Sequence, residues 1–461
     1  MRAVVYRGVN DLRLETVPVP RIGARELLVR VAVCGVCPTD IKKIQYGTVP
    51  PPRIFGHETA GTVVRAGARV RGFKPGDRVA LHHHVPCLDC HFCRHHAFAQ
   101  CETYKRTGIT AGFQPAGGGY AEYVRVLPFV LPGVVKIPAK NSFAEGAMLE
   151  PVNTVLKAVR RLSLLPGDVV LVAGQGPIGL MFTRLLQLVG ARVIATDLLE
   201  PRLRLARKFG AKWVVNVSGS RRKEAHYSSE SRSRRKESVG AEVTRLGSNL
   251  NQSKVGAEVR RLGPNPDQAK VGADVRRLGP NPEPNLSLIT SIPAIRTIDA
   301  AVIAVPSDAA VQQALQLIRC GGQVLLFAHT KRSGPSSLSA ACGGEGRGEV
   351  VQNSTLNPLS SVASAKGDQP HGAPKRSEGG STLNFPLDLA SICLDEKDLL
   401  GSYSSDFTLQ DEVARLVFSR RLDVRDLISH RFPLEQTAAA VRLASRPTED
   451  SLKIVVCVAG D

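Results

Sequence analysis

Four closely spaced cysteines constrain this chain more than any other feature of its 461 residues. Cys87, Cys90, Cys93 and Cys101 follow the spacing C-x2-C-x2-C-x7-C. A tetrahedral zinc ion needs four ligands, with thiolates at about 2.3 Å, and one short segment here carries all four. Buried free cysteines or a disulfide cluster would not require this spacing. Because four thiolates leave no open coordination position, the sequence predicts a structural zinc in a lobe at 84–104.

A second, mixed set of metal-ligand residues lies in different motifs. Cys37 lies in CGVCPTD, the pair His57 and Glu58 lies in FGHETAGTV, and Glu150 begins EPVNT. One thiolate, one imidazole and one or two carboxylates, with a position left for water, are typical of catalytic zinc. Each of these residues taken alone is also common in a protein core. The hypothesis of a catalytic zinc site therefore depends on the order of the residues in the chain and on the motifs around them. The sequence therefore predicts a catalytic zinc held by Cys37, His57 and one or both glutamates.

A glycine-rich turn in the second third of the chain predicts dinucleotide binding. Residues 169–179 read VVLVAGQGPIG, an apolar strand followed by Gly174, Gly176 and Gly179 in the pattern G-x-G-x-x-G. The first glycine allows a tight turn, the second allows the backbone to approach a pyrophosphate, and the third allows close helix–strand packing. Pro177 and Ile178 complete the candidate turn.

The strand after this helix ends in an acidic residue that bears on cofactor choice. It reads ARVIATD and ends at Asp197, 18 residues after Gly179. A carboxylate there would accept hydrogen bonds from ribose hydroxyl groups and repel a 2′-phosphate, which favours NAD over NADP. Arg202 lies close in sequence and would weaken this preference.

With these motifs the chain resembles the zinc-dependent medium-chain alcohol dehydrogenases, most closely their polyol (sorbitol or iditol) and threonine dehydrogenase branch. The resemblance covers roughly residues 1–217, 298–330 and 384–459, and it includes GGGYAEY at 117–123. It implies an α/β protein with two domains. A GroES-like, β-rich catalytic domain is expected at 1–150 and 404–461, and a Rossmann NAD-binding domain with a doubly wound parallel sheet is expected at 151–403.

The resemblance also implies an enzyme and assigns roles. Zinc lowers the pKa of a secondary alcohol, and a hydride passes to NAD, giving a ketone. The substrate is expected to be a polyol or a threonine-like 3-hydroxy amino acid. Thr39 would begin a proton relay, Asp40 would orient His57, and His84 would shuttle protons. The family varies in which glutamate binds zinc, so Glu58 and Glu150 both remain candidates. Two zinc ions per subunit and a homo-oligomer, a dimer or tetramer, are expected.

Two stretches do not fit the resemblance. Residues 218–297 contain three 16-residue repeats, at 238–253, 254–269 and 270–285, with few large apolar residues and Gly-Pro-Asn-Pro breakers. Residues 331–384 are rich in Ser, Gly and Ala. Neither composition favours a packed core, so both are predicted to be disordered insertions. A scaffold impaired by these insertions, or a zinc-free reductase of the same superfamily, is the alternative function.

Net charge and hydropathy bear on two other classes of protein, those that bind nucleic acids and those that span membranes. The formal net charge is +20, but acidic residues interrupt the basic segment 220–237 and Tyr227 is its only aromatic residue, which disfavours nucleic-acid binding. No run of 18 apolar residues predicts a membrane span. The first residues resemble a strand and turn rather than a signal peptide. Together with the zinc-type cysteines, these features predict a cytoplasmic protein.

Overall fold

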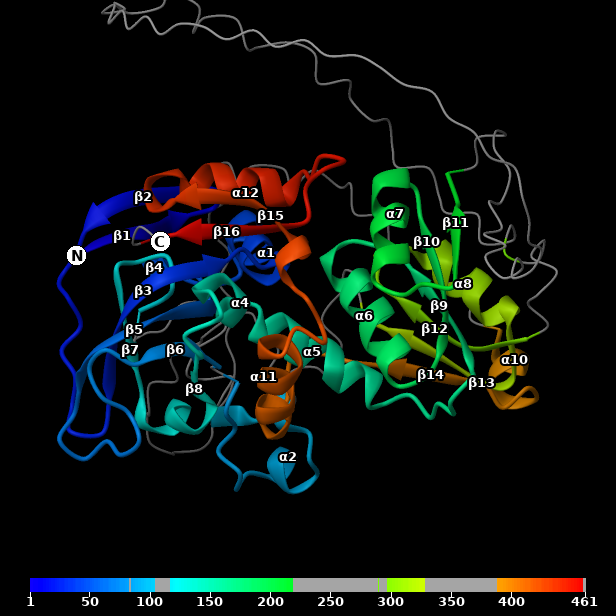
Figure 1. Ribbon diagram of the computed structural model, residues 1–461, viewed down its shortest axis with the longest axis horizontal. Helices are drawn as coiled ribbons and strands as arrows, with labels where there is room; N and C mark the ends of the chain where they lie inside the picture. The colour runs from blue at the N-terminus through cyan, green and yellow to red at the C-terminus, as the bar shows by residue number, and fades with distance from the viewer. Residues whose placement is uncertain (83, 104–116, 219–288, 290–296, 328–387, 459–461) are drawn as a thin grey trace, which may run out of the picture. The chain divides into compact units, whose positions relative to one another are not determined.

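The computed structural model describes residues 1–82, 84–103, 117–218, 289, 297–327 and 388–458 (Figure 1). Apart from Ser218, Ile289 and Thr297, the two predicted insertions at 218–297 and 331–384 lie outside the described residues. Ile289 is buried, and it belongs to a hydrophobic cluster that also contains residues of the six-stranded sheet described below.

A seven-stranded, mainly antiparallel sheet contains residues from both ends of the chain. Its strands are β3 (Leu27–Gly35), β5 (Glu58–Ala66), β6 (Arg78–Leu81), β7 (Tyr123–Val126), β8 (Val135–Lys136), β15 (Ile428–Pro433) and β16 (Lys453–Cys457). Their order is β15-β16-β3-β5-β6-β8, and β7 also pairs with β3. All residues of β3 except Arg30 are buried, as the apolar run LLVRVAVCG favours for a strand covered on both faces. The β3–β5 register places Gly35 opposite Glu58.

A small three-stranded sheet adjoins the N-terminus. It has the order β2-β1-β4, with β1 (Arg2–Gly8), β2 (Asp11–Thr16) and β4 (Arg53–Ile54). The β1–β2 connection is a tight antiparallel hairpin in which Asn10 has a φ of 59°. Asparagine tolerates this left-handed conformation better than most residues, which suits it to the turn.

The second large sheet is entirely parallel. Its strands are β9 (Val169–Ala173), β10 (Arg192–Asp197), β11 (Trp213–Asn216), β12 (Ile298–Ile303), β13 (Ile318–Leu326) and β14 (Asp398–Gly401). They run in the order β11-β10-β9-β12-β13-β14, and every neighbouring pair is parallel. All of β9 is buried, as expected of a central parallel strand covered on both faces.

Helices cover both faces of this parallel sheet (Figure 1). Val170 and Val172 of β9 pack in one cluster with residues of α6 (Pro177–Leu188) and α7 (Glu200–Lys208). Their neighbour Leu171 points to the opposite face and packs with residues of α8 (Asp308–Leu317) and α10 (Leu389–Cys393). Alternate side chains of one strand thus enter two cores. The predicted α/β class with a doubly wound parallel sheet is confirmed.

The remaining helices connect or cover the two large sheets. The α-helices are α1 (Pro38–Tyr46), α2 (His91–Arg94), α4 (Phe143–Ala147), α5 (Leu149–Val159), α11 (Gln410–Phe418) and α12 (Thr437–Ser445). The 3₁₀ turns are η1 (Phe98–Gln100), η3 (Pro128–Gly133), η6 (Phe407–Leu409), η7 (Arg425–Leu427) and η8 (Leu434–Gln436). Helix α4 begins with a capping box, in which Ser142 and Glu145 each accept from the other's backbone N–H. The α5 and α11 helices share a core cluster with both large sheets.

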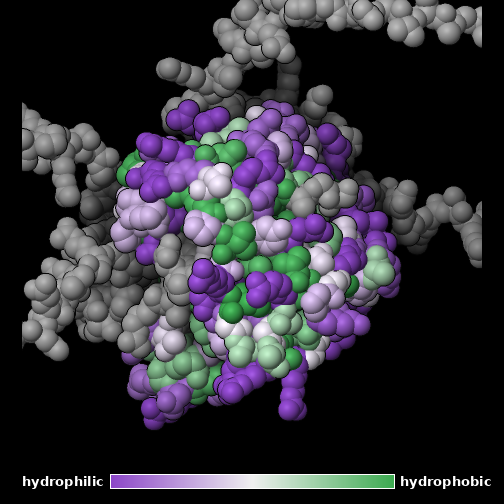
Figure 2. Space-filling view, turned by 90° about the vertical axis from the view of Figure 1, so that its left-hand side faces the viewer, coloured by the Kyte–Doolittle hydropathy of each residue, from purple (hydrophilic) through white to green (hydrophobic). Residues whose placement is uncertain are grey.

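The surface mixes polar and apolar residues. Figure 2 shows green hydrophobic patches between purple hydrophilic ones on the face that it presents. Such mixing is ordinary, because there is not enough polar surface to cover a folded protein. Among the described residues, no helix combines the length and the apolar character needed to cross a membrane.

Arg125 and Glu26 form a partly buried ion pair beside β3. Arg125 donates two hydrogen bonds to the Glu26 carboxylate, at 2.7 and 2.6 Å, and the Gly23 N–H donates a third at 2.7 Å. The Arg125 hydrogen bond holds the pKa of Glu26 below its ordinary value near 4.5. A lowered folded-state pKa stabilises the fold above the unfolded-state pKa, and this contribution is lost as pH falls through the folded-state pKa.

Replacing Glu26 with glutamine should therefore cost about 2 kcal/mol of unfolding free energy at neutral pH. The difference between the two proteins should shrink steadily below pH 4.5. Urea unfolding at a series of pH values measures it. A difference that stays constant down to acid pH would show that lost packing, not lost charge, explains the effect.

Candidate functional site

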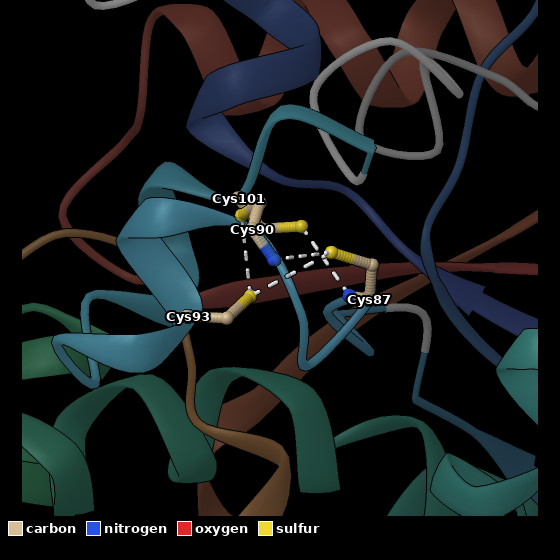
Figure 3. A group of neighbouring side chains, drawn as sticks. All are labelled: Cys87, Cys90, Cys93 and Cys101. Carbon is tan, nitrogen blue, oxygen red and sulfur yellow. Dashed lines mark hydrogen bonds between the residues drawn. The ribbon is translucent and has the colours of Figure 1, made fainter.

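The four cysteines of the lobe converge on one point (Figure 3). Cys90 is the N-cap of α2, Cys93 lies inside that helix, and Cys101 directly follows η1. The backbone N–H of Cys87 points to the Cys101 Sγ at 3.3 Å, and that of Cys90 points to the Cys87 Sγ at 3.4 Å. Backbone hydrogen bonds, with that from Asp89 the largest cause, lower the pKa of Cys87 to about 6. Donors directed at sulfur favour the thiolate that binds metals.

The spacing of the sulfur atoms fits zinc. The Cys93 Sγ lies 3.9 Å from the Cys87 Sγ and 3.5 Å from the Cys90 Sγ. Four thiolates at about 2.3 Å from a tetrahedral zinc are about 3.8 Å apart. All four sulfur atoms lie within 4.8 Å of one another. The geometry therefore matches a closed, four-thiolate zinc site.

Cys37, His57 and Glu58 form a second group whose ligand atoms lie within 4.8 Å of one another. Cys37 is the N-cap of α1, and its Sγ accepts a hydrogen bond from the Thr39 N–H at 3.4 Å. His57 and Glu58 are both buried; Glu58 is the first residue of β5, and His57 directly precedes it. The Asp40 Oδ1 lies 3.0 Å from the His57 Nδ1, which leaves Nε2 as the ring nitrogen for a metal.

Electrostatics around His57 favour a cation. Burial alone would lower the pKa of His57, but the charge and hydrogen bonding of Asp40 and Cys37 raise it well above its usual range. The negative surroundings that would hold a proton on this ring would equally attract a metal ion. The Asp40 Oδ2 is buried with no hydrogen-bond partner in the described part of the chain. The donor set and its charge thus fit a divalent metal such as zinc.

Lys453, at the start of β16, is the partner of Glu58. Its Nζ lies 2.5 Å from each Glu58 carboxylate oxygen and donates to the Val36 carbonyl at 3.1 Å. Both side chains are almost fully buried. Burial lowers the pKa of Lys453, but the charges of Glu58, Cys37 and Glu150 and the hydrogen bond to Glu58 together raise it above its ordinary value. A metal at this site would share Glu58 with the Lys453 ammonium group.

Glu150 contacts His84 rather than the three-residue group. Its Oε1 lies 3.4 Å from the His84 Nδ1, and both side chains are buried. Burial, with Glu58 and Asp40 adding to it, raises the pKa of Glu150 to about 7, against the opposing charges of His57 and Lys453. The Glu58 carboxylate therefore lies with Cys37 and His57, whereas the Glu150 carboxylate lies against His84.

The predicted glycine turn joins β9 to α6. Gly174 has a φ of 92°, and a Cβ on Gly179 would lie 1.8 Å from the Gly174 carbonyl oxygen, so both positions require glycine. A Cβ on Gly176 would meet nothing within 4 Å. Gly176 is the N-cap of α6 and offers no side chain to the helix end, with Pro177 next. The first N–H groups of a helix are an anion site, which suits a pyrophosphate.

Asp197 and Arg202 lie beside this turn, and Asp197 also supports it. The Asp197 carboxylate accepts hydrogen bonds from the N–H groups of Gln175, at 2.6 Å, and Leu199, at 2.9 Å. The nearest Arg202 nitrogen is 3.9 Å from Asp197, and another donates to the Ser451 carbonyl at 3.4 Å. Ile178 is partly exposed in the first turn of α6.

The structure also shows polar contacts that the sequence analysis missed. Ser405, after β14, hydrogen-bonds the His84 Nδ1 and lies 3.5 Å from the His82 Nε2. Two signals could have indicated such residues. A lone lysine is the second residue of the otherwise apolar LKIVVCV, and a cluster of serines follows the parallel strand LLG, at the carboxyl edge where ligands bind.

Comparisons with known proteins agree with these motifs. Residues 23–139 match the family model of the alcohol dehydrogenase GroES-like domain. The sorbitol dehydrogenase of Bacillus subtilis (strain 168) is 33% identical over 223 residues, which are 47% of this chain and 61% of that protein. Residues 23–139 are thus similar to the alcohol dehydrogenase GroES-like domain, and the chain matches less than two thirds of the length of this sorbitol dehydrogenase. The sorbitol dehydrogenase of Gallus gallus is 34% identical over 221 residues, 47% of this chain and 60% of the relative.

Solved structures support the fold over the whole length. The alcohol dehydrogenase TADH from Thermus sp. ATN1 superposes with a TM-score of 0.66 and covers 100% of both chains, at 22% sequence identity. By contrast, the sequence match spans only about 60% of the sorbitol dehydrogenases. The predicted GroES-like and Rossmann architecture is confirmed.

Proposed function

We propose that this protein is a zinc-dependent dehydrogenase that transfers a hydride from a secondary alcohol, a polyol such as sorbitol, to NAD and gives a ketone. The observation that carries the proposal is the buried group of Cys37, His57 and Glu58. The sorbitol dehydrogenase relatives support the polyol class. The proposed subunit holds two zinc ions, the other bound by the four cysteines of the lobe.

Residues of this chain can orient the metal ligands, move the substrate proton and bind the cofactor. When bound, a zinc ion would act as a Lewis acid toward the substrate hydroxyl group. Asp40 fixes the His57 ring, and Lys453 fixes the Glu58 carboxylate. The Thr39 hydroxyl, whose own N–H donates to the Cys37 Sγ, would accept the substrate proton and pass it on. The β9–α6 turn would hold the pyrophosphate of the cofactor.

NAD is the cofactor that Asp197 favours. Its buried carboxylate ends β10, and its negative charge would repel a 2′-phosphate. Arg202 is partly engaged with the Ser451 carbonyl, which limits its use as a phosphate partner. We assign cofactor binding to 151–403 and catalysis to 1–150 with 404–461, as two domains.

The proposal also covers the oligomeric state of the protein and its cellular compartment. Strand β14 is an outer strand of the parallel sheet, and three leucines near it are exposed: Leu399 on the strand, Leu389 on α10 and Leu394 directly after α10. An outer strand that pairs on one side only within the described residues, with apolar neighbours, favours pairing with a second copy, so we propose a homo-oligomer, measurable by sedimentation velocity. Zinc-binding thiolates favour a reducing compartment, hence the cytoplasm.

The deciding experiment is cofactor reduction by the purified protein with sorbitol, threonine and ethanol. We expect sorbitol to be oxidised, NAD to be preferred over NADP, and activity to fall at least about 100-fold on zinc chelation and to return with added zinc. Activity on threonine alone would assign the protein to the other branch. No activity on any of them, with zinc and NAD bound, would contradict the proposal and favour an impaired scaffold.

A further inference from the structure

A charged hollow lies beside α6, α7 and the segment that follows α11. Its volume is about 400 Å³, which is in the range of small-molecule sites. Apart from Phe209, its lining residues are all charged: Arg184, Lys208, Arg420, Arg421, Asp423, Arg425 and Asp426. Five cations and two anions give the lining a formal charge of +3. A hollow with an excess of one sign of charge attracts ligands of the opposite sign.

Apolar residues hold the segment after α11 in place. Leu422, Val424 and Leu427 are buried in one hydrophobic cluster with residues of α6 and α7. The Arg184 Nε on α6 donates to the Arg421 carbonyl at 2.8 Å, which fastens the segment to that helix. The charged side chains between the buried ones are therefore carried by a backbone that packing fixes.

The two acidic residues of the lining each pair with one cation. Arg425 donates hydrogen bonds to both Asp423 carboxylate oxygens, at 2.9 and 2.6 Å. The Lys208 Nζ lies 2.8 Å from the Asp426 carboxylate. Because these two pairs cancel in charge, the other three arginines of the lining carry the excess.

These three arginines differ in their partners. The Arg420 Nε lies 3.1 Å from the carboxylate of Glu145, which is buried and lies outside the lining. Arg184 donates to neutral acceptors, the Arg421 carbonyl and the Gln187 side chain, both at 2.8 Å. The Arg421 side chain has no hydrogen bond or ion pair with any residue that the structure describes. Among the described residues, two guanidinium groups thus line the hollow without a carboxylate partner.

An arginine without a carboxylate partner is suited to a phosphate group. The guanidinium group stays charged at physiological pH and can donate two parallel hydrogen bonds to one phosphate. Because a water molecule takes up about 30 Å³, a hollow of about 400 Å³ has room for more than a phosphate ion. The charge and the volume together indicate a small organic molecule that carries a phosphate group.

We propose that this hollow is a second ligand site, at which Arg184 and Arg421 bind the phosphate group of a small phosphorylated molecule. It is separate from the glycine turn, because α6 begins at the turn and Arg184 lies seven residues after Pro177, about 10 Å along the helix axis. Lys208 is the last residue of α7, the helix that follows the strand ending at Asp197. Both helices return the chain between neighbouring parallel strands, so their last residues lie toward the sheet edge opposite the turn. The site does not depend on the proposed dehydrogenase activity.

Isothermal titration calorimetry of the full, zinc-loaded chain at about 0.15 M salt tests the site. The probe is phosphoenolpyruvate, which has a phosphate group but no hydroxyl group that could mimic an alcohol substrate. It should bind once per subunit with a dissociation constant below about 1 mM, and saturating NAD should not change this constant. Propionate, which keeps the carboxylate but lacks the phosphate group, should not bind. Inorganic phosphate should bind more weakly than phosphoenolpyruvate.

The opposite results would overturn the site as proposed. A dissociation constant above about 1 mM would mean that the hollow does not select an organic phosphate. Competition with NAD would show that the phosphate group binds at the glycine turn instead. Equal affinity for inorganic phosphate and phosphoenolpyruvate would show that the hollow takes the free ion rather than a phosphorylated molecule.

Three variants locate the bound probe. Arg421→Gln should weaken phosphoenolpyruvate binding about tenfold, because it removes one positive charge and a pair of donors, and Arg184→Gln should do the same. The midpoint of thermal unfolding of Arg421→Gln should stay at the wild-type value, since this side chain has no partner among the described residues. Arg415→Gln is the matched control, because Arg415 is an exposed arginine of α11 outside the lining.

The control should change the dissociation constant less than about twofold. Equal weakening in all three variants would show that the net charge of the protein, rather than the hollow, attracts the probe. Unchanged binding in Arg421→Gln would overturn the proposal directly.

Discussion

Replacing Lys453 with methionine should destabilise the folded protein by about 3–5 kcal/mol, because it leaves the Glu58 carboxylate buried without its partner. Glu58 is 1% exposed, and Lys453 contacts both of its oxygens at 2.5 Å. The Val36 carbonyl would lose a donor as well. Methionine has a similar volume, so lost packing contributes little to the expected effect.

Urea unfolding of zinc-loaded and zinc-chelated protein measures this cost. The loss should be larger after chelation, since a divalent ion at Cys37, His57 and Glu58 would partly neutralise the carboxylate that Lys453 no longer pairs with. Lys453→Arg is the matched control, because it keeps the charge. The double variant Lys453→Met, Glu58→Gln should recover part of the stability. A loss below about 1 kcal/mol in both states would mean that the ion pair is not a buried one in solution.

The sequence predicted best what depends on residues close together in the chain. The lobe cysteines all lie within 87–101, and the glycine turn, its strand and its helix lie within 169–188. In both cases short-range geometry requires particular residue types, such as glycine at Gly179, where any Cβ would collide with the Gly174 carbonyl oxygen. The buried parallel strands were likewise visible as continuous apolar runs.

The sequence did not predict which polar side chains far apart in the chain would contact one another. Lys453 and Glu58 are 395 positions apart, and Ser405 and His84 are 321 apart. Nothing in a single sequence says which distant polar side chain will meet a buried carboxylate, since that depends on how β16 pairs with β3. For the same reason the choice between Glu58 and Glu150 stayed open. The ligand atoms of Glu58, Cys37 and His57 lie within 4.8 Å of one another, whereas the Glu150 Oε1 lies 3.4 Å from the His84 Nδ1.

Replacing Cys93 with serine should remove one zinc ion per subunit and unfold the lobe at 84–104. A structural zinc bound by four protein ligands typically contributes an apparent binding free energy of about 10–16 kcal/mol near neutral pH, and that energy is available for folding. Cys93 lies close to two other cysteine sulfur atoms, at 3.5 and 3.9 Å, so its loss opens the tetrahedron. The lobe has few large apolar residues to hold it together without the metal, with Phe98 one of those packed against the core.

A metallochromic dye measures the number of zinc ions released on unfolding, and we expect this number to fall from two to one per subunit in Cys93→Ser. The midpoint temperature of thermal unfolding should also fall. Cys320→Ser is the matched control, because Cys320 is exposed and lies outside both cysteine-containing groups. It should keep two zinc ions and the wild-type midpoint. Two zinc ions in Cys93→Ser would show that three thiolates and water suffice to hold the lobe metal. One zinc ion in the wild type would show that only one of the two groups binds zinc, although both have ligand atoms within 4.8 Å of one another.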